Sequence, residues 1–532
     1  MKKTALLSVY DKTGIVEFAK ALVELGWNIL SSGGTAKVIS AAGISVTDVA
    51  TLIGGKAILG HRVVTLSRQV HAGILARYIE EDLRELETEK IPLIDLVCVD
   101  MYPLKEEISK PDCTVESVIE KTDIGGPTML RSAVKGRRIV LCEAGDRPRV
   151  IEWLKSGEPE KEKFINELVA KAESVVADYV LSSAIYHGKG KYTGMVGTQK
   201  TVCKYGENGH QIPAALYCKS DNEDHLAIDK FKITAGTEPS YNNYCDIDRL
   251  LQTMTHIAAT FDINYNRIPF IALGAKHGNV CGAAIGFSSP EEVTKNMILG
   301  DPLAIFGGLV MLNFQVTKKI TEAILSYRAS KILDGIIAPG FDDGTMEMMK
   351  RKGDKCRFIV NPSLANLSHD SLDKNPRFRY VRGGLLLQPN YTFILDLKNP
   401  ELKKIGQATE EQERDMLLAK AICDTSNSNT ITLVIKGTLI GNGVGQQARV
   451  YGSMLALDRA TACGHSILGA SAASDSFFPY TDGVEALVKA GVKSIISTSG
   501  SVKDEDVIKY CQKKDIALYL IPDKIGRGFF GH

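Results

Sequence analysis

The sequence predicts an α/β fold, because apolar strands and helix-like segments alternate along almost the whole chain. Three observations carry this prediction. Continuous apolar runs such as "LIDLVCVDMY" (93–102) are typical of strands that a parallel sheet buries on both faces. Segments such as "GIVEFAKALVELG" (14–26) have helical spacing. Glycine turns such as "SSGGT" (31–35) stand where strands end.

The first 195 residues hold the first alternation. We expect a helix at 14–26 and strands at 5–10, 28–36, 93–102 and 137–144, the second of which runs into a glycine turn. A polar, glycine-bearing stretch at 187–210 then interrupts the pattern. It predicts a boundary near residue 198, and so the domains 1–197 and 198–532.

A second alternation follows. We expect a helix at 410–425 and strands at 269–275, 335–341, 430–443, 493–500 and 516–521. No repeat is visible in the letters of the sequence.

Charge and cysteine content narrow the function classes. The chain has 64 basic and 63 acidic residues, a net charge of +1, which argues against broad binding to nucleic acid or to an anionic membrane. No run approaches 18 uninterrupted apolar residues, so no membrane span is predicted. The start reads as a first strand and not as a secretory signal. The eleven cysteines are scattered without a C-x-x-C pair, as in a reduced cytoplasmic protein.

One candidate anion site lies early in the chain. Ser32, Gly33, Gly34 and Thr35 join an expected strand to a helix, where free amides and hydroxyls can cradle a phosphate. Lys12 follows the first strand and is expected at the same edge of a parallel sheet. An ordinary strand–helix turn is the alternative.

The stretch "TDIGGPTMLRSAVK" (122–135) is a second candidate. Asp123 is placed to cap a helix whose first amides belong to Ile124 and Gly125, and Lys135 lies about three turns further on. The alternative is a capped helix with no chemical role.

The pair Lys276–His277 is the third candidate. It ends the apolar run "IPFIAL" (268–273) and precedes small residues. This stretch alone fits a solvated loop as well as a catalytic base with an adjacent cation.

Motifs throughout the chain resemble one family. They include "SVYDKTG", "SSGGTAK", "VHAGILAR", "MYPL", "DIGGPTMLRSAVK", "YGENGHQ", "SYNNYCDID", "KHGNVCG", "IFGG", "SNSN", "GVGQQARV" and "SDSFFPYTDGV", in the family's order. The chain is thereby similar to the bifunctional enzymes that combine AICAR transformylase with inosine monophosphate (IMP) cyclohydrolase. The resemblance implies a methylglyoxal-synthase-like parallel-sheet domain followed by two cytidine-deaminase-like α/β subdomains.

The resemblance also implies two reactions. A formyl group passes from 10-formyltetrahydrofolate to AICAR, giving FAICAR, which then closes to IMP with loss of water. For the first reaction it implies His277 as base, Lys276 as the cation beside the oxyanion, and Asn427 as their orienting partner. Ribonucleotide contacts fall on Lys204, Tyr205, Asn243, Gly307, Asp334, Asn427, Arg449, Phe477 and Arg527. Folate contacts fall on Val450, Asp482, Ser501 and Val502.

For ring closure the resemblance implies Lys135, Tyr102 and Asp123 as catalytic residues, with the Asp123–Gly125 amides at the oxyanion. Nucleotide contacts fall on Tyr10, Asp11, Lys12, Ser32, Gly33, Gly34, Thr35, Arg62, Val63, Val64, Thr65, Val99, Asp100, Ile124 and Gly125. It implies a homodimer acting on the small molecules AICAR, FAICAR, IMP and folate, with no metal.

Several positions depart from the family's pattern, and three of them fall on the implied ligand contacts. Val64 stands where a lysine is usual, Asp100 replaces an asparagine, and Lys204 replaces an arginine. His61 or Arg68 is a possible source of the charge absent at Val64.

The departures leave alternatives open. A transformylase whose first domain is a degenerate nucleotide-binding module is one. A zinc nucleoside deaminase is another, although the H-x-E and P-C-x-x-C ligands are absent.

Overall fold

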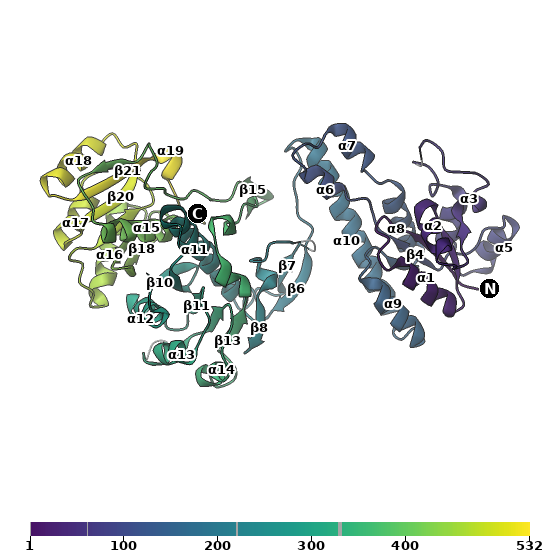
Figure 1. The fold of residues 1–532 in the computed structure, drawn as a ribbon, viewed down its shortest axis with the longest axis horizontal. Helices are drawn as coiled ribbons and strands as arrows, with labels where there is room; N and C mark the ends of the chain where they lie inside the picture. The colour runs from purple at the N-terminus through teal and green to yellow at the C-terminus, as the bar shows by residue number, and fades with distance from the viewer. Residues whose placement is uncertain (1, 61, 220–221, 328–331, 532) are drawn as a thin grey trace. The chain divides into compact units, whose positions relative to one another are not determined.

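The computed structural model describes residues 2–60, 62–219, 222–327 and 332–531 (Figure 1). The chain forms two compact units, Met1–Val196 and Gly197–His532, and each is described by itself. No helix in the described ranges is long and apolar enough to cross a membrane.

The first unit is built on a five-stranded sheet in which every pair of neighbouring strands is parallel. In spatial order the strands are β3 (Thr47–Asp48), β2 (Asn28–Ser31), β1 (Thr4–Ser8), β4 (Leu96–Val99) and β5 (Ile139–Leu141). The central strands β1 and β4 are buried almost throughout, because helices cover both faces of a parallel sheet.

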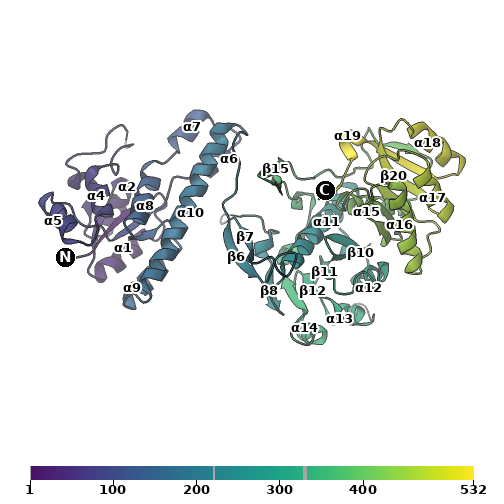
Figure 2. The same ribbon diagram turned by 180° about the vertical axis from the view of Figure 1, so that it is seen from behind.

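Ten α-helices accompany this sheet among the described residues of the unit. They are α1 (Ile15–Glu24), α2 (Gly33–Ala41), α3 (Val49–Leu52), α4 (Arg68–Leu75), α5 (Glu80–Thr88), α6 (Leu104–Ser109), α7 (Val115–Glu120), α8 (Gly125–Lys135), α9 (Asp146–Lys155) and α10 (Lys161–Gly188). The long helix α10 packs along α8, β5 and α6 (Figure 2).

The second unit is built on a mixed twelve-stranded sheet. In spatial order the strands are β16 (Lys403–Ile405), β21 (Ala517–Pro522), β20 (Ser494–Ser499), β19 (Ser471–Ser474), β17 (Ile431–Ile435), β18 (Thr438–Gly443), β10 (Asn279–Gly286), β9 (Phe270–Lys276), β11 (Leu309–Leu312), β12 (Gly335–Ala338), β13 (Arg357–Val360) and β8 (Lys232–Ala235). Two separate ribbons pair β6 (Thr198–Cys203) with β7 (Ala214–Cys218) and β14 (Arg377–Val381) with β15 (Gly384–Gln388).

The helices of the second unit separate these strands along the chain. They are α11 (Tyr241–Tyr265), α12 (Pro290–Gly300), α13 (Lys318–Leu325), α14 (Thr345–Met349), α15 (Glu410–Asp424), α16 (Arg449–Ala462), α17 (Asp482–Ala490), α18 (Asp504–Lys513) and α19 (Asp523–Gly526), with 3₁₀ turns at Ile228–Lys230, Pro362–Asn366 and His369–Ser371.

The twelve-stranded sheet consists of two halves with the same topology. From its centre outward the order is β10-β9-β11-β12-β13-β8 on one side and β18-β17-β19-β20-β21-β16 on the other. Each half has an antiparallel hairpin, then parallel strands, then an antiparallel edge strand. Helix α11 directly precedes the hairpin of the first half and α15 that of the second, and the two helices pack together (Figure 1). The unit is therefore an internal duplication that the letters of the sequence do not reveal.

The structure confirms the α/β class, with a parallel sheet followed by a mixed α/β region. The expected single strand at 430–443 is wrong: β17 and β18 form a hairpin there, with Lys436 and Gly437 at its turn. Both turn residues have positive φ, 50° and 71°, which is the geometry of a two-residue hairpin. The strands that were not anticipated from the sequence are β3, β6, β7, β8, β10, β11, β13, β14, β15, β16 and β19.

Candidate active sites

Lys276 and His277 lie at a two-residue hairpin turn between β9 and β10. Lys276 ends β9, and His277 and Gly278 form the turn with φ of 54° and 72°. Two successive positive φ values are typical of a type I′ turn, where Asn and Gly are the usual residues. A histidine there costs about 1–2 kcal/mol of backbone strain relative to glycine. The turn exposes the imidazole at the end of a rigid, buried hairpin.

Asp246 holds this turn from beneath. Its buried carboxylate accepts the amide of Gly278 at 2.6 Å and attracts the charge of His277. Burial raises the pKa of Asp246, while the Gly278 amide and the charge of His277 oppose that rise. Asp246 is the sixth residue of α11, which begins with a capping box between Ser240 and Asn243.

The second half of the sheet repeats this arrangement. Asp415, the sixth residue of α15, accepts the amides of Lys436 and Gly437 at 2.7 Å each. Its helix also begins with a capping box, at Thr409. A carboxylate under each hairpin turn is thus part of the duplicated fold, but only the first turn carries a histidine.

Lys276 is directed to the loop before β11. Its ammonium donates to the Phe306 carbonyl at 2.7 Å, and a Cβ on Gly307 would lie 3.9 Å from it. The Asp334 amide bonds Gly308 at 2.9 Å, which brings that segment alongside Gly307. Asp334 itself pairs with Arg351 at 3.2 Å. The structure therefore brings Lys276, Gly307 and Asp334 together.

Asn427 lies between the hairpin and the C-terminal tail. Its backbone N–H donates to Oδ1 of Asn279, the residue after the turn, at 3.4 Å. Its side-chain NH₂ donates to the Gly531 carbonyl. Buried Arg249 bonds the Asn427 oxygen at 3.4 Å and the Phe530 carbonyl at 2.9 Å. The tail and Arg249 together fix the Asn427 side chain.

A cavity of about 460 Å³ adjoins Asn427. Its lining includes five predicted residues: Arg449, Val450, Phe477, Asp482 and Arg527. Lys276 and His277 are not among its walls. Within the described part of one chain, the Lys276–His277 turn and these five lining residues thus form two groups, and Asn427 lies between them.

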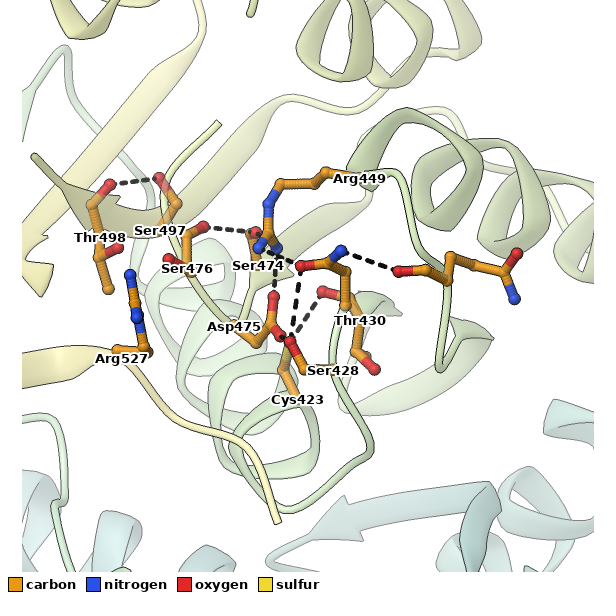
Figure 3. A network of polar contacts seen from close by, with 12 residues as sticks. Cys423, Ser428, Thr430, Arg449, Ser474, Asp475, Ser476, Ser497, Thr498 and Arg527 are labelled. Atoms are coloured by element: carbon orange, nitrogen blue, oxygen red, sulfur yellow. Dashed lines mark hydrogen bonds and ion pairs between the residues drawn. The ribbon is translucent and has the colours of Figure 1, made fainter. Parts of the chain in front are cut away.

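Arg449 is the centre of a buried polar network on one wall of this cavity (Figure 3). Its guanidinium bonds Ser474 at 2.8 Å, Asn429 at 2.7 Å and the fully buried carboxylate of Asp475. Such a forked set of bonds holds a guanidinium in one orientation. Arg527 also lines the cavity, with its guanidinium 5.9 Å from the centre of the Phe477 ring and paired with Asp523 at 2.6 Å.

The four predicted folate residues separate in the structure. Val450 and Asp482 line the cavity, at the starts of α16 and α17. Ser501 and Val502 lie in the loop after β20 and do not line it, and Val502 is 98% exposed. Gly500, the residue before them, lies close to the cavity, since a Cβ on Gly500 would be 3.9 Å from the Phe477 ring.

Lys204, Tyr205 and Asn243 lie near the start of α11. Lys204 and Tyr205 follow β6, in a loop that Asn242 contacts through the Glu207 carbonyl at 3.2 Å. The Asn243 side chain accepts the Ser240 amide and hydroxyl at 3.0 Å each, so it serves the helix cap. None of the three residues lines the cavity.

Cys281 is buried in the hairpin, where its thiol contacts the Gly274 carbonyl at 3.5 Å. Burial raises its pKa to about 12, which agrees with a packing role and not with a nucleophile. No group of three or more His, Cys, Asp or Glu side chains suited to a metal ion occurs within the described ranges.

In the first unit, the predicted anion cradle forms at the start of α2. No side chain caps this helix, because the Ser32 hydroxyl bonds Ser8 at 2.9 Å, and Gly33 and Gly34 are exposed. Lys12 lies alongside, with its Cε 3.8 Å from a Cβ placed on Gly34. Partial burial lowers the pKa of Lys12. Free amides and a lysine thus meet at one edge. Thr35 is turned away, since it bonds both backbone groups of Val9.

Asp100 orders the loop that carries Lys12. It follows buried Val99 of β4, and its carboxylate accepts the amides of Tyr10 and of Asp11, the latter at 3.3 Å. Burial raises its pKa, which these amides and buried Arg147, 3.8 Å away, oppose. Asp11 bonds Thr13 at 2.9 and 2.7 Å.

The Asp123 carboxylate caps α8 from one residue before the N-cap position, which is Ile124. Its carboxylate accepts the amide of Gly126 at 2.9 Å, and further amide bonds from Tyr102 and Gly125 oppose the rise in its pKa that burial causes. The Asp123 amide donates to Tyr179 at 2.7 Å. The amides of Asp123 and Gly125 therefore already have partners in the structure, and their role at an oxyanion stays a prediction.

Of the remaining first-unit residues, Thr65, Tyr102 and Ile124 lie at the start of α8. A Cβ on Gly125 would lie 2.8 Å from the Thr65 hydroxyl, and exposed Arg62 pairs with Glu120. Tyr10 and Tyr102 meet edge to face at 5.5 Å, Ile124 is exposed, and Val63 bridges to Ile58. Lys135 ends α8, roughly 15 Å along the axis from Gly125 at about 1.5 Å per residue, and its role stays a prediction.

The sequence reading missed Asp246, Arg249, Asp475 and Arg147. Each is a buried charged residue whose partner lies far away along the chain. Asp246 alone had a local signal, since it follows an S-x-x-N capping box by three residues.

Comparison with known proteins agrees with this architecture. The family model described as "AICARFT/IMPCHase bienzyme" matches residues 136–459, more than half of the chain, and the model "MGS-like domain" matches residues 14–128. One similar solved structure is titled "Crystal structure of ForH". It is 36% identical, covers 36% of this chain and 100% of its own, and has a TM-score of 0.33, too low to bear on the fold.

Proposed function

Because the chain belongs to the AICARFT/IMPCHase bienzyme family, which carries transformylase and cyclohydrolase activities in purine biosynthesis, we propose that it performs both reactions itself. The second unit transfers a formyl group from 10-formyltetrahydrofolate to AICAR. The first unit closes the product, FAICAR, to IMP. The observation that carries the proposal is the strained His277 turn, held by Asp246 and connected to Asn427 through Asn279.

In formyl transfer, His277 removes the proton of the AICAR 5-amino group. That amine is a poor nucleophile, because its lone pair is delocalised into an imidazole that bears a carboxamide. A base acting as the C–N bond forms is therefore needed, and imidazole suits neutral pH. The Lys276 ammonium stabilises the oxyanion of the tetrahedral intermediate. Asn427, fixed by the tail and Arg249, orients these groups.

The substrates of formyl transfer occupy the cavity and its surroundings. Arg449 and Arg527 supply positive charge for the ribonucleotide phosphate, and Phe477 supplies an aromatic face for its base. Val450 and Asp482 hold the folate. Because Lys276 and His277 do not line this cavity, we propose a homodimer in which one protomer's hairpin serves its partner's cavity.

In ring closure, the FAICAR phosphate lies at Gly33, Gly34 and Lys12. The reacting groups lie beside Tyr102 and Asp123. Holding the carboxamide nitrogen against the formyl carbon contributes heavily to an intramolecular reaction. Tyr102 transfers protons, and the Thr65 hydroxyl orients the substrate.

The test is to give the purified chain AICAR and 10-formyltetrahydrofolate and to follow FAICAR and IMP separately. We expect both products in sequence. In a second arm FAICAR alone is supplied, and we expect IMP. Accumulation of FAICAR without IMP in both arms would leave the transformylase alone, with the first unit a nucleotide-binding module. If Lys276→Ala/His277→Ala formylates AICAR at the wild-type rate, the transformylase assignment is wrong.

A further inference from the structure

Because Val64 stands where the family usually has a lysine, the first unit lacks a positive charge at that position. Its side chain packs against the apolar core of this unit, so the position offers no cation. Arg68 does not replace it, because its guanidinium pairs with Glu89 at 3.1 Å. His61 lies outside the described residues. Ring closure nevertheless places negative charge on the formyl oxygen, so a cation near Tyr102 is of direct chemical use.

Lys121 is a cation that the structure places beside Tyr10, the neighbour of Tyr102. It is the residue after α7, and its ammonium lies 5.4 Å from the centre of the Tyr10 ring. Tyr10 in turn meets the Tyr102 ring at 5.5 Å. Glu107 is within electrostatic reach of Lys121, but its carboxylate is already paired with Lys110 at 2.6 Å. The Lys121 charge thus remains available beside Tyr10, whose ring contacts Tyr102.

The backbone of Lys121 is held on both sides. Buried Tyr179, on α10, donates its hydroxyl to the Lys121 carbonyl at 3.0 Å. The same hydroxyl accepts the Asp123 amide at 2.7 Å. One side chain therefore fixes Lys121 relative to Asp123, the residue that caps α8.

The segment that carries Val64 contacts this same junction. Arg62 pairs with Glu120, the neighbour of Lys121. The Thr65 hydroxyl lies 2.8 Å from where a Cβ on Gly125 would be. The segments that carry positions 121 and 64 thus lie next to each other beside the start of α8.

We propose that Lys121 supplies the positive charge that stabilises the oxyanion during ring closure, in place of a lysine at position 64. The carboxamide nitrogen bonds the formyl carbon, and the electron pair of its C=O bond moves to oxygen beside the Lys121 ammonium. One proton from the carboxamide nitrogen and one from the formamide nitrogen then go to that oxygen. The C–O bond breaks, water leaves and a C=N bond completes the ring. The inference rests on the proposed function of the first unit.

The test compares FAICAR closure by wild type and by full-length Lys121→Met, Lys121→Arg and Lys121→Met/Val64→Lys. We expect Lys121→Met to lower kcat by about 10- to 100-fold with little change in KM, since one stabilising group is lost from the transition state. Lys121→Arg and the added Val64→Lys each recover most of the rate. Lys155→Met, an exposed lysine on α9, is the matched control and keeps the wild-type rate.

The outcomes separate the two proposals. If wild type does not convert FAICAR to IMP, the proposed function of the first unit is wrong, and the role of Lys121 falls with it. If wild type closes the ring and Lys121→Met is as fast, only the role of Lys121 is wrong. A slow Lys121→Met that neither Lys121→Arg nor Val64→Lys restores also overturns it, because a purely structural role would not depend on charge from either segment.

Discussion

Replacing Asp246 tests whether the turn beneath His277 is held for catalysis. Asp246→Asn keeps an oxygen that can accept the Gly278 amide but removes the charge next to His277. Asp246→Ala removes both. The fold should survive either change, because the hairpin β9–β10 is anchored by its own ladder and by its neighbours β11 and β18.

The expected size follows from the contact. A hydrogen bond to a buried charged group contributes about 1.5–3 kcal/mol, and the turn must hold His277 in a conformation that costs about 1–2 kcal/mol. Since about 1.4 kcal/mol corresponds to a tenfold change in rate, we expect Asp246→Ala to lower the transformylase kcat by about 10- to 100-fold. Asp246→Asn should lower it by roughly 3- to 10-fold, because only the charge is lost.

The assay follows AICAR formylation, with Asp415→Asn as the control. Asp415 holds the equivalent turn of the second half, so its loss imposes the same structural cost without touching His277. We expect Asp246→Asn to lower kcat and Asp415→Asn to leave it near the wild-type value, since only Asp246 lies beneath the turn that carries His277. Equal effects of the two variants on kcat would show that Asp246 matters only for stability.

Three further predictions concern the cavity and the fold. Arg449→Lys should raise the KM for AICAR about tenfold, because an ammonium cannot keep the bonds to Ser474, Asn429 and Asp475 together; an unchanged KM in steady-state assays would contradict this. Arg249→Leu should free the tail, lowering transformylase activity about tenfold and speeding removal of the last residues by carboxypeptidase, whereas equal digestion rates would argue against a clasp. Burial raises the pKa of Asp415 to about 6, so the folded state is stabilised by the protonated carboxyl. This stabilisation is complete below about pH 4 and is lost as pH rises through 6. The unfolding free energy of wild type relative to Asp415→Asn should therefore fall by about 2 kcal/mol between pH 4 and 6, and a constant difference would refute the burial effect.

Local signals in the sequence were sufficient where the physics is local. The apolar run at 93–102 contains β4, and the helix expected at 14–26 contains α1. Asp123 caps α8, as a carboxylate ahead of two glycines suggests. Gly33, Gly34 and Lys12 also lie together as predicted, whereas Thr35 is turned away; consecutive parallel strands end at one sheet edge.

What the sequence could not supply depends on contacts between distant residues. Arg249 reaches Phe530 across 281 positions, and Arg147 reaches the Thr13 carbonyl across 134. No periodicity encodes such pairs. The sequence could have shown that Asn243 caps α11. It could not have shown that the side-chain amide serves this cap instead of a ligand, since both uses need the same amide. The hairpin at 436–437 was missed because a lysine, and not an asparagine, precedes its glycine.

The internal duplication separates what the fold requires from what the chemistry requires. Each hairpin turn has a half-buried residue, an exposed residue at positive φ, a glycine at positive φ and a helix carboxylate bonded to the turn. In the second half the first two positions are Ile435 and Lys436, which satisfy the geometry without any titratable base near neutral pH. In the first half they are Lys276 and His277. The backbone geometry is met equally well in both halves, so it does not account for the imidazole and its neighbouring ammonium. Their presence at one turn only is the reason to assign them to catalysis and not to the fold.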